Sequence, residues 1–145
     1  MITQEQFQQL AAEGHSAHPH NFVPVVREVL SDLDTPLSVY LKLADGPYTY
    51  LFESVEGGER FGRYSIIGMP ARRIYSFRGH TLEVSELGEV VERREVADPL
   101  AEVEVLRKQY SVPQLEGLPG FTGGLVGWFG FECIQYIEPH LGAGD

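Results

Sequence analysis

Apolar residues recur at helical spacing in three stretches of the chain, and each stretch begins at a residue suited to capping a helix N-terminus. In the first, Thr3 and Gln6 have the spacing of a capping box. In the other two, the pairs Thr35-Pro36 and Asp98-Pro99 place a proline in the first helical turn, where its missing N–H costs nothing. The predicted helices run over residues 3–12, 35–44 and 98–110.

Between the second and third helices the pattern changes to short apolar stretches separated by glycine or proline. Connections this short join antiparallel neighbours, because a parallel crossover needs about a dozen residues or more. The sequence therefore predicts an α+β fold, with an antiparallel β-meander and flanking helices. The predicted strands cover residues 48–55, 62–68, 71–78, 80–85 and 89–96.

Two further segments are rich in apolar residues. Residues 22–30 contain several β-branched valines and favour an extended conformation, although Arg27-Glu28 would also suit a helix. Residues 121–131 are apolar and interrupted by glycines, and side chains such as Trp128 and Phe129 need another backbone or sheet to cover them. We expect the chain to be an amino-terminal piece of a longer protein that supplies this cover.

The overall charge limits the choice of partners. The formal net charge is −10, with 21 acidic residues against 11 Lys plus Arg, and such a field repels phosphate backbones and anionic lipid surfaces. The amino end lacks the basic and apolar regions of a signal peptide, and apolar residues nowhere run together for the about 18 positions of a membrane span. We expect a cytoplasmic protein that binds neither nucleic acid nor membranes.

The cysteine and the clustered histidines are the candidate metal ligands, and neither group is expected to bind a metal. A single cysteine, Cys133, makes neither an internal disulfide nor a cysteine-based zinc site, and we expect it to be buried in the core. His15, His18 and His20 lie in a polar stretch with no acidic residue closer than Glu13, which does not favour a metal site.

Catalytic and nucleotide-binding motifs are weak. Residues 57–64 have the glycine spacing of a phosphate loop but lack its Lys-Ser/Thr pair and contain an acid, so nucleotide binding is rejected. Glu132 and Glu138 are six positions apart and do not share a helical face, and no pair of carboxylates suited to acid/base catalysis stands out. Arg63 is expected to form only a surface ion pair with a nearby glutamate, worth about 0–1 kcal/mol.

Glu53 and Ser54 have the chemistry that a free amino acid requires. A carboxylate can bind the ligand's ammonium group, and a hydroxyl can donate to its carboxylate. Neighbours in a strand face opposite sides, so the pair can meet one ligand only near a strand end where the backbone bends, as Gly57-Gly58 would allow. Taken alone, a charged residue at a strand end is more commonly just solvated.

The residues around Glu53-Ser54 form a sequence motif that is specific to one protein family. Residues 51–68, LFESVEGGERFGRYSIIG, together with residues 34–43, DTPLSVYLKL, closely resemble the N-terminal part of component I of anthranilate synthase, and the resemblance extends from about Val23 to His140. It implies that Ser54, Glu53 and Pro36 belong to an allosteric tryptophan-binding site. It also implies an incomplete N-terminal part of the β-sandwich of chorismate-utilising enzymes. The histidine-containing stretch departs from the family, which usually runs from the first helix directly into the Val-Pro-Val-Val-Arg segment.

The resemblance further implies an activity for the full-length protein. Members of the family convert chorismate to anthranilate and pyruvate with Mg²⁺, and they take ammonia from a glutamine amidotransferase, component II. Their chorismate and magnesium residues lie in a C-terminal domain, so the resemblance assigns no catalytic or metal residue here. Residues 1–145 would be the regulatory region and inactive alone.

Two alternatives remain open from the sequence. Aminodeoxychorismate synthase component I and the isochorismate and salicylate synthases share the fold, but the Glu53-Ser54 context and residues 57–60 favour the anthranilate branch. The other alternative is a stand-alone amino-acid-binding regulatory domain, against which the apolar residues 121–131 argue.

Overall fold

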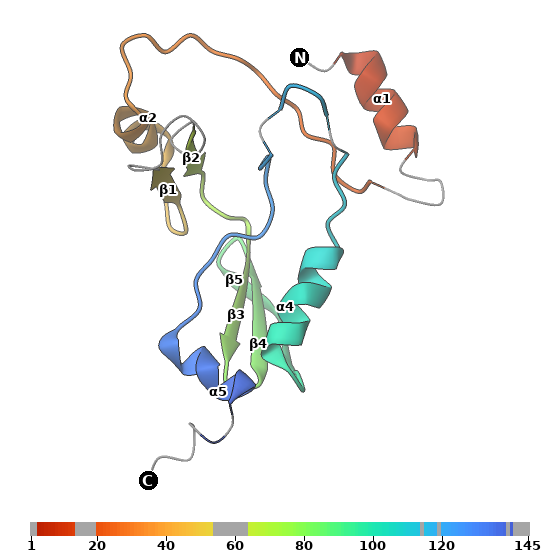
Figure 1. Cartoon of the computed structure of the whole chain (residues 1–145), viewed down its shortest axis with the longest axis vertical. Helices are drawn as coiled ribbons and strands as arrows, with labels where there is room; N and C mark the ends of the chain where they lie inside the picture. The colour runs from red at the N-terminus through yellow and green to blue at the C-terminus, as the bar shows by residue number, and fades with distance from the viewer. Residues whose placement is uncertain are drawn as a thin grey trace. The chain divides into compact units, whose positions relative to one another are not determined.

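The protein has an α+β fold, seen in a computed structural model of the chain (Figure 1). The structure describes residues 3–13, 20–53, 64–113, 115–118, 120–138 and 140. The chain folds into two compact units. One comprises Val29–Glu95 and the other comprises Met1–Glu28 together with Val96–Asp145.

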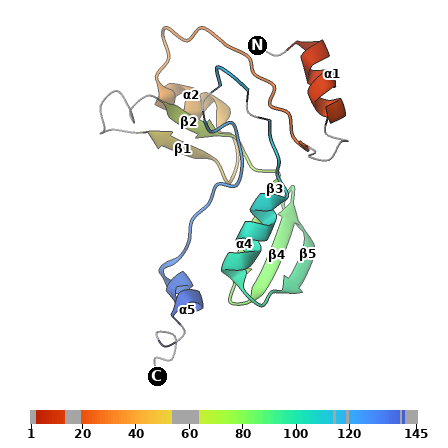
Figure 2. The same cartoon turned by 45° about the vertical axis from the view of Figure 1, so that its right-hand side comes forward.

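The first sheet of the Val29–Glu95 unit is a pair of short strands. Strand β1 (Tyr50–Glu53) pairs antiparallel with strand β2 (Ser65–Gly68), and helix α2 (Pro36–Leu43) lies against both strands (Figure 2). The sequence correctly predicted all three elements but began the first strand too early, and the predicted residues 54–55 lie outside the described residues. Tyr48 was expected within it, whereas its φ of 60° is left-handed and turns the chain before the strand begins.

The second sheet of this unit has three antiparallel strands in the order β3-β4-β5. These are β3 (Arg73–Arg78), β4 (Thr81–Glu86) and β5 (Glu89–Glu95), close to the predicted bounds. A tight turn at Leu87-Gly88 joins the last two, and both of its residues have positive φ, 51° and 89°.

The expected meander is therefore divided into two sheets, which corrects the sequence prediction. β2 and β3 follow one another in the chain but do not pair. Pro70 lies in their connection, and because proline has no backbone N–H it cannot donate to a ladder between them.

The central strand β4 has one polar and one buried apolar face. Leu82 and Val84 are 0% and 3% exposed, while Thr81, Glu83 and Ser85 between and beside them are half-buried. This alternation is the period-two pattern of a sheet with one solvated face.

The other unit contains helices α1 (Gln4–Glu13) and α4 (Pro99–Lys108), as predicted. The expected capping box is present, since the backbone N–H of Thr3 donates to Gln6 at 2.9 Å and that of Gln6 to the Thr3 hydroxyl at 3.2 Å. Residues 20–28 contain neither helix nor ladder strand. Asn21 ties them to Ser111, whose backbone N–H donates to the Asn21 side-chain oxygen at 2.7 Å.

The described residues after 120 contain little regular secondary structure. Residues 121–130 form no strand, and they lead into a short 3₁₀ turn, Phe131–Cys133, and the one-turn helix α5 (Ile134–Ile137). Gly123 and Gly124 have φ values of 140° and 146°, which interrupt an extended strand. Cys133, expected in the core, is only half-buried because it lies in this turn beside the 90% exposed Phe131.

Asp98 caps helix α4, and its loss should destabilise this unit. One oxygen of its carboxylate accepts hydrogen bonds from the backbone N–H groups of Leu100 and Ala101, at 2.9 and 3.1 Å. Asp98→Ala is expected to lower the free energy of unfolding by about 0.5–2 kcal/mol, measured by denaturant titration. Asp98→Asn keeps a capping oxygen and serves as the control, so equal stability of Asp98→Ala and wild type would contradict this role.

Candidate functional site

Glu53 ends strand β1 with its carboxylate open to solvent. It faces Ser65, the first residue of β2, in the ladder, and the Ser65 hydroxyl donates to a carboxylate oxygen at 3.5 Å. This contact is long, so the carboxylate keeps most of its capacity to accept hydrogen bonds from an ammonium group. Glu53 can therefore fill the role that the sequence assigned to it.

Pro36, the second predicted site residue, occupies the first turn of α2 and is exposed. Thr35, which precedes Pro36, forms a capping box with Ser38, two residues after Pro36. The backbone N–H of Thr35 donates to the Ser38 hydroxyl at 2.9 Å, and the backbone N–H of Ser38 donates to the Thr35 hydroxyl at 3.1 Å. Because α2 lies against β1 and β2, the elements that carry Pro36 and Glu53 are packed together in one unit.

Ser54, the third predicted site residue, lies outside the described residues. The same holds for Arg63 and for the Gly57-Gly58 turn expected beside the site. The expectation that Ser54 and Glu53 meet one ligand therefore stays a prediction.

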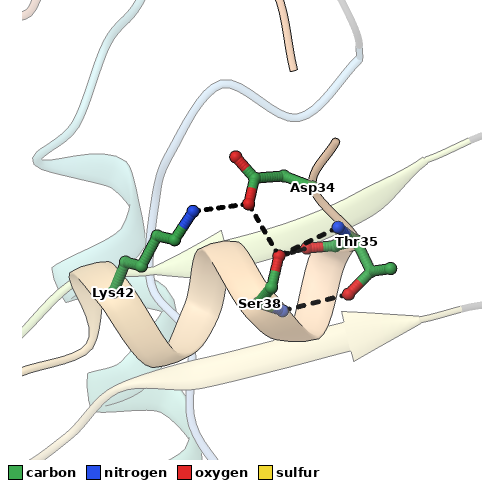
Figure 3. Close-up of polar contacts among 4 residues, drawn as sticks. All are labelled: Asp34, Thr35, Ser38 and Lys42. Carbon is green, nitrogen blue, oxygen red and sulfur yellow. Dashed lines mark hydrogen bonds and ion pairs between the residues drawn. The ribbon is translucent and has the colours of Figure 1, made fainter. Parts of the chain in front are cut away.

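Asp34 and Lys42 extend the α2 cap, and sequence reasoning did not identify them. Asp34 Oδ1 accepts hydrogen bonds from the Ser38 hydroxyl at 2.9 Å and from the Lys42 ammonium at 2.5 Å (Figure 3). The hydrogen bond from Lys42, followed by that from Ser38, holds the pKa of Asp34 below its ordinary value. The signal in the sequence was an acid just before the cap and a lysine in the last turn, both favourable to the helix dipole.

Tyr50 and Phe52 form an aromatic pair on the face of β1 opposite to Glu53. Their ring centroids are 4.8 Å apart, and Phe52 is half exposed. Tyr50 stands directly across the ladder from Gly68, the buried last residue of β2. The sequence identified none of these contacts, because cross-strand neighbours depend on register.

Of the histidines considered as metal ligands, only His20 lies among the described residues. His20 is bound through Nδ1 to the Ser111 hydroxyl at 3.1 Å, whereas His15 and His18 lie outside the described residues. Within the part of the chain that the structure describes, no three His, Cys, Asp or Glu residues are grouped to hold a metal ion. In the same part, none of the helices has the length and apolar character to cross a membrane.

The fold and the site together define an α+β unit in which a capped helix and a short hairpin carry an open carboxylate. The chain is 50% identical over 140 residues to "Anthranilate synthase component 1" of Pseudomonas aeruginosa, a match that covers 97% of this chain and 27% of that protein. The protein of the same name from Neisseria meningitidis serogroup B is 49% identical over 138 residues, covering 95% and 27%. That of Acinetobacter calcoaceticus is 42% identical over 144 residues, covering 97% and 28%.

These similarities confirm the resemblance found in the sequence: the chain is a homologue of the N-terminal portion of anthranilate synthase component 1. It spans 27–28% of the length of these curated relatives. No family model matches the chain. No solved structure matches it either.

Proposed function

We propose that this chain is the N-terminal, tryptophan-sensing region of an anthranilate synthase component I, which converts chorismate to anthranilate and pyruvate in tryptophan biosynthesis. One observation carries the proposal. Proteins of that name are 49–50% identical to the chain over 95–97% of its length. The same similarity favours the anthranilate branch over aminodeoxychorismate and isochorismate synthases and over a stand-alone regulatory domain.

In this proposal the chain's own residues bind the effector and perform no catalysis. The Glu53 carboxylate, exposed at the end of β1, accepts hydrogen bonds from the ammonium group of tryptophan. Ser54, the next residue along the chain, donates its hydroxyl to the effector's carboxylate. Pro36 and its capped helix α2 bound the site from the neighbouring element.

The cofactor and the partner belong to the proposal for the whole protein. Mg²⁺ would bind chorismate and stabilise developing charge, and a glutamine amidotransferase, component II, would supply ammonia. Because the described residues contain no cluster of metal-binding side chains, no step involving the metal is assigned to this chain. The proposed location is the cytoplasm.

A chimeric enzyme tests this function directly. We define the completed enzyme as residues 1–145 of this chain joined to the remaining C-terminal part of the Pseudomonas aeruginosa relative, which this chain does not cover. It is expected to form anthranilate from chorismate, ammonia and Mg²⁺, and to be inhibited by tryptophan. The chain alone is expected to form none above a control without protein.

The outcomes separate the two parts of the proposal. Anthranilate formation by the chain alone would contradict the assignment of catalysis to other residues. A completed enzyme that is active but insensitive to tryptophan would contradict the regulatory role, provided that the intact Pseudomonas aeruginosa protein is inhibited in the same assay.

A further inference from the structure

The ring of Tyr50 lies against the backbone of Gly68. A Cβ atom built on Gly68 would be 2.0 Å from Cε1 of Tyr50 and 2.4 Å from both Cδ1 and Cζ. Side-chain atoms do not approach one another so closely, so an alanine at this position would have to displace the ring. No left-handed φ accompanies Gly68, so the effect of a side chain here would come from the space that the Tyr50 ring occupies.

This contact lies at one end of the β1-β2 ladder, and helix α2 also packs against both strands. Four ladder pairs join β1 and β2, from Tyr50 with Gly68 to Glu53 with Ser65. A two-stranded sheet is marginal in water without side-chain packing, and an aromatic ring lying over a cross-strand glycine is a known way to stabilise such a pair. Phe52 packs on the same ring, at a centroid distance of 4.8 Å, and so adds to the contact.

The contact also sets which way Glu53 faces. A slip of the ladder by one residue would turn every side chain of β1 to the opposite face of the hairpin. Tyr50 fits over residue 68 only because that residue has no side chain, whereas the residue before it is Ile67. The ring therefore favours the register that places Glu53 opposite Ser65, at the end of the strand where the effector is proposed to bind.

We infer that Tyr50 and Gly68 are positioning residues of the tryptophan site, an inference that rests on the proposed function. They do not touch the effector in this inference. They hold β1 in the register and orientation that present Glu53. Substituting either residue should weaken inhibition by tryptophan, while catalysis by other parts of the protein should continue.

The test measures the tryptophan concentration for half-inhibition of the completed enzyme, together with kcat/KM for chorismate without tryptophan. Gly68→Ala and Tyr50→Ala are each expected to raise that concentration by roughly 5- to 150-fold, the range expected for a strained packing contact and a typical allosteric coupling. The value of kcat/KM should stay close to wild type. Tyr50→Phe keeps the ring, so its tryptophan concentration for half-inhibition should equal that of the wild type.

The double variant Tyr50→Ala/Gly68→Ala isolates the contact. Once the ring is absent, the added methyl group at residue 68 meets no ring, so the double variant should respond like Tyr50→Ala alone. Gly120→Ala is the matched control, because a Cβ atom there meets nothing within 4 Å in the described structure. It should leave inhibition unchanged.

Three results would overturn the inference: normal inhibition of Gly68→Ala, effects that add in the double variant, or loss of kcat/KM in parallel with inhibition. The last result would make the contact merely structural. Failure of the proposed function is distinguishable, because the completed enzyme with the wild-type chain would then itself be insensitive to tryptophan. If Gly68→Ala does not fold, Tyr50→Ala and Tyr50→Phe decide the question.

Discussion

Ser54→Ala in the completed enzyme is expected to raise the tryptophan concentration for half-inhibition by roughly 10- to 150-fold. A hydroxyl that donates to a charged carboxylate contributes about 1.5–3 kcal/mol, and its removal lowers effector affinity by the corresponding factor. Catalysis without tryptophan should stay close to that of the wild type, because the reacting groups are assigned to other parts of the protein. Steady-state inhibition curves at fixed chorismate measure the effect.

Ser54→Phe should have a still larger effect and abolish inhibition, since the ring fills the pocket as well as removing the hydrogen bond. Ser65→Ala is a matched control: it removes a hydroxyl of the same hairpin, one that makes only a 3.5 Å contact with Glu53, and it should change inhibition little. Inhibition of Ser54→Ala equal to wild type would show that the Ser54 hydroxyl does not bind the effector. Collapse of activity without tryptophan would show that it is structural.

Linkage adds a check that needs no variant. If tryptophan weakens chorismate binding by a given factor, chorismate must weaken tryptophan binding by the same factor. Equilibrium binding of each ligand in the presence of the other measures both factors. If both factors equal one while tryptophan still inhibits, the inhibition acts on the rate of catalysis and not on chorismate binding.

The chain alone is expected to self-associate and to bind a hydrophobic dye strongly. Large apolar side chains near its carboxyl end are open to solvent: Trp128 is 87% exposed, Phe131 90% and Phe129 65%. A cluster of this kind on a soluble protein marks a surface that another part or partner covers. In the completed enzyme the relative's C-terminal part should cover it, and dye binding should fall.

Paired variants locate the source of this behaviour. Trp128→Ser/Phe131→Ser should reduce dye fluorescence and the sedimenting oligomer fraction of the chain alone. Leu87→Ser removes a comparably exposed side chain, 74%, at a hairpin turn distant in sequence, and it should change neither measurement. If the wild-type chain is instead a monomer that unfolds cooperatively and binds no dye, the stand-alone regulatory domain becomes the better proposal.

Much of the secondary structure was predictable because its causes are local. Thr3 and Gln6 form the capping box that their spacing indicates, and Asp98 caps α4 ahead of a proline. The turn at Leu87-Gly88 lies where a glycine separates two apolar stretches. A cap or a turn needs only residues a few positions apart, so the sequence is enough to place it.

The errors arose where distant residues decide the outcome. Cys133 was expected in the core, but burial depends on which distant residues cover a side chain, and in the described structure this one is only half-buried. The division of the meander at Pro70 likewise depends on which strands pair, and local pattern does not specify pairing.

For the candidate site, the sequence by itself predicted the chemistry: a resemblance to a family assigns Glu53, Ser54 and Pro36 to a tryptophan site, and that assignment stays a prediction. The comparisons with known proteins support the family. Only the tertiary structure decided that Glu53 stands opposite Ser65 and that Tyr50 lies on Gly68. The physical reason is register. The sequence gives the type of each residue, but packing between the strands decides which residue faces it across the sheet. At residue 68, an added methyl group would meet the ring of Tyr50.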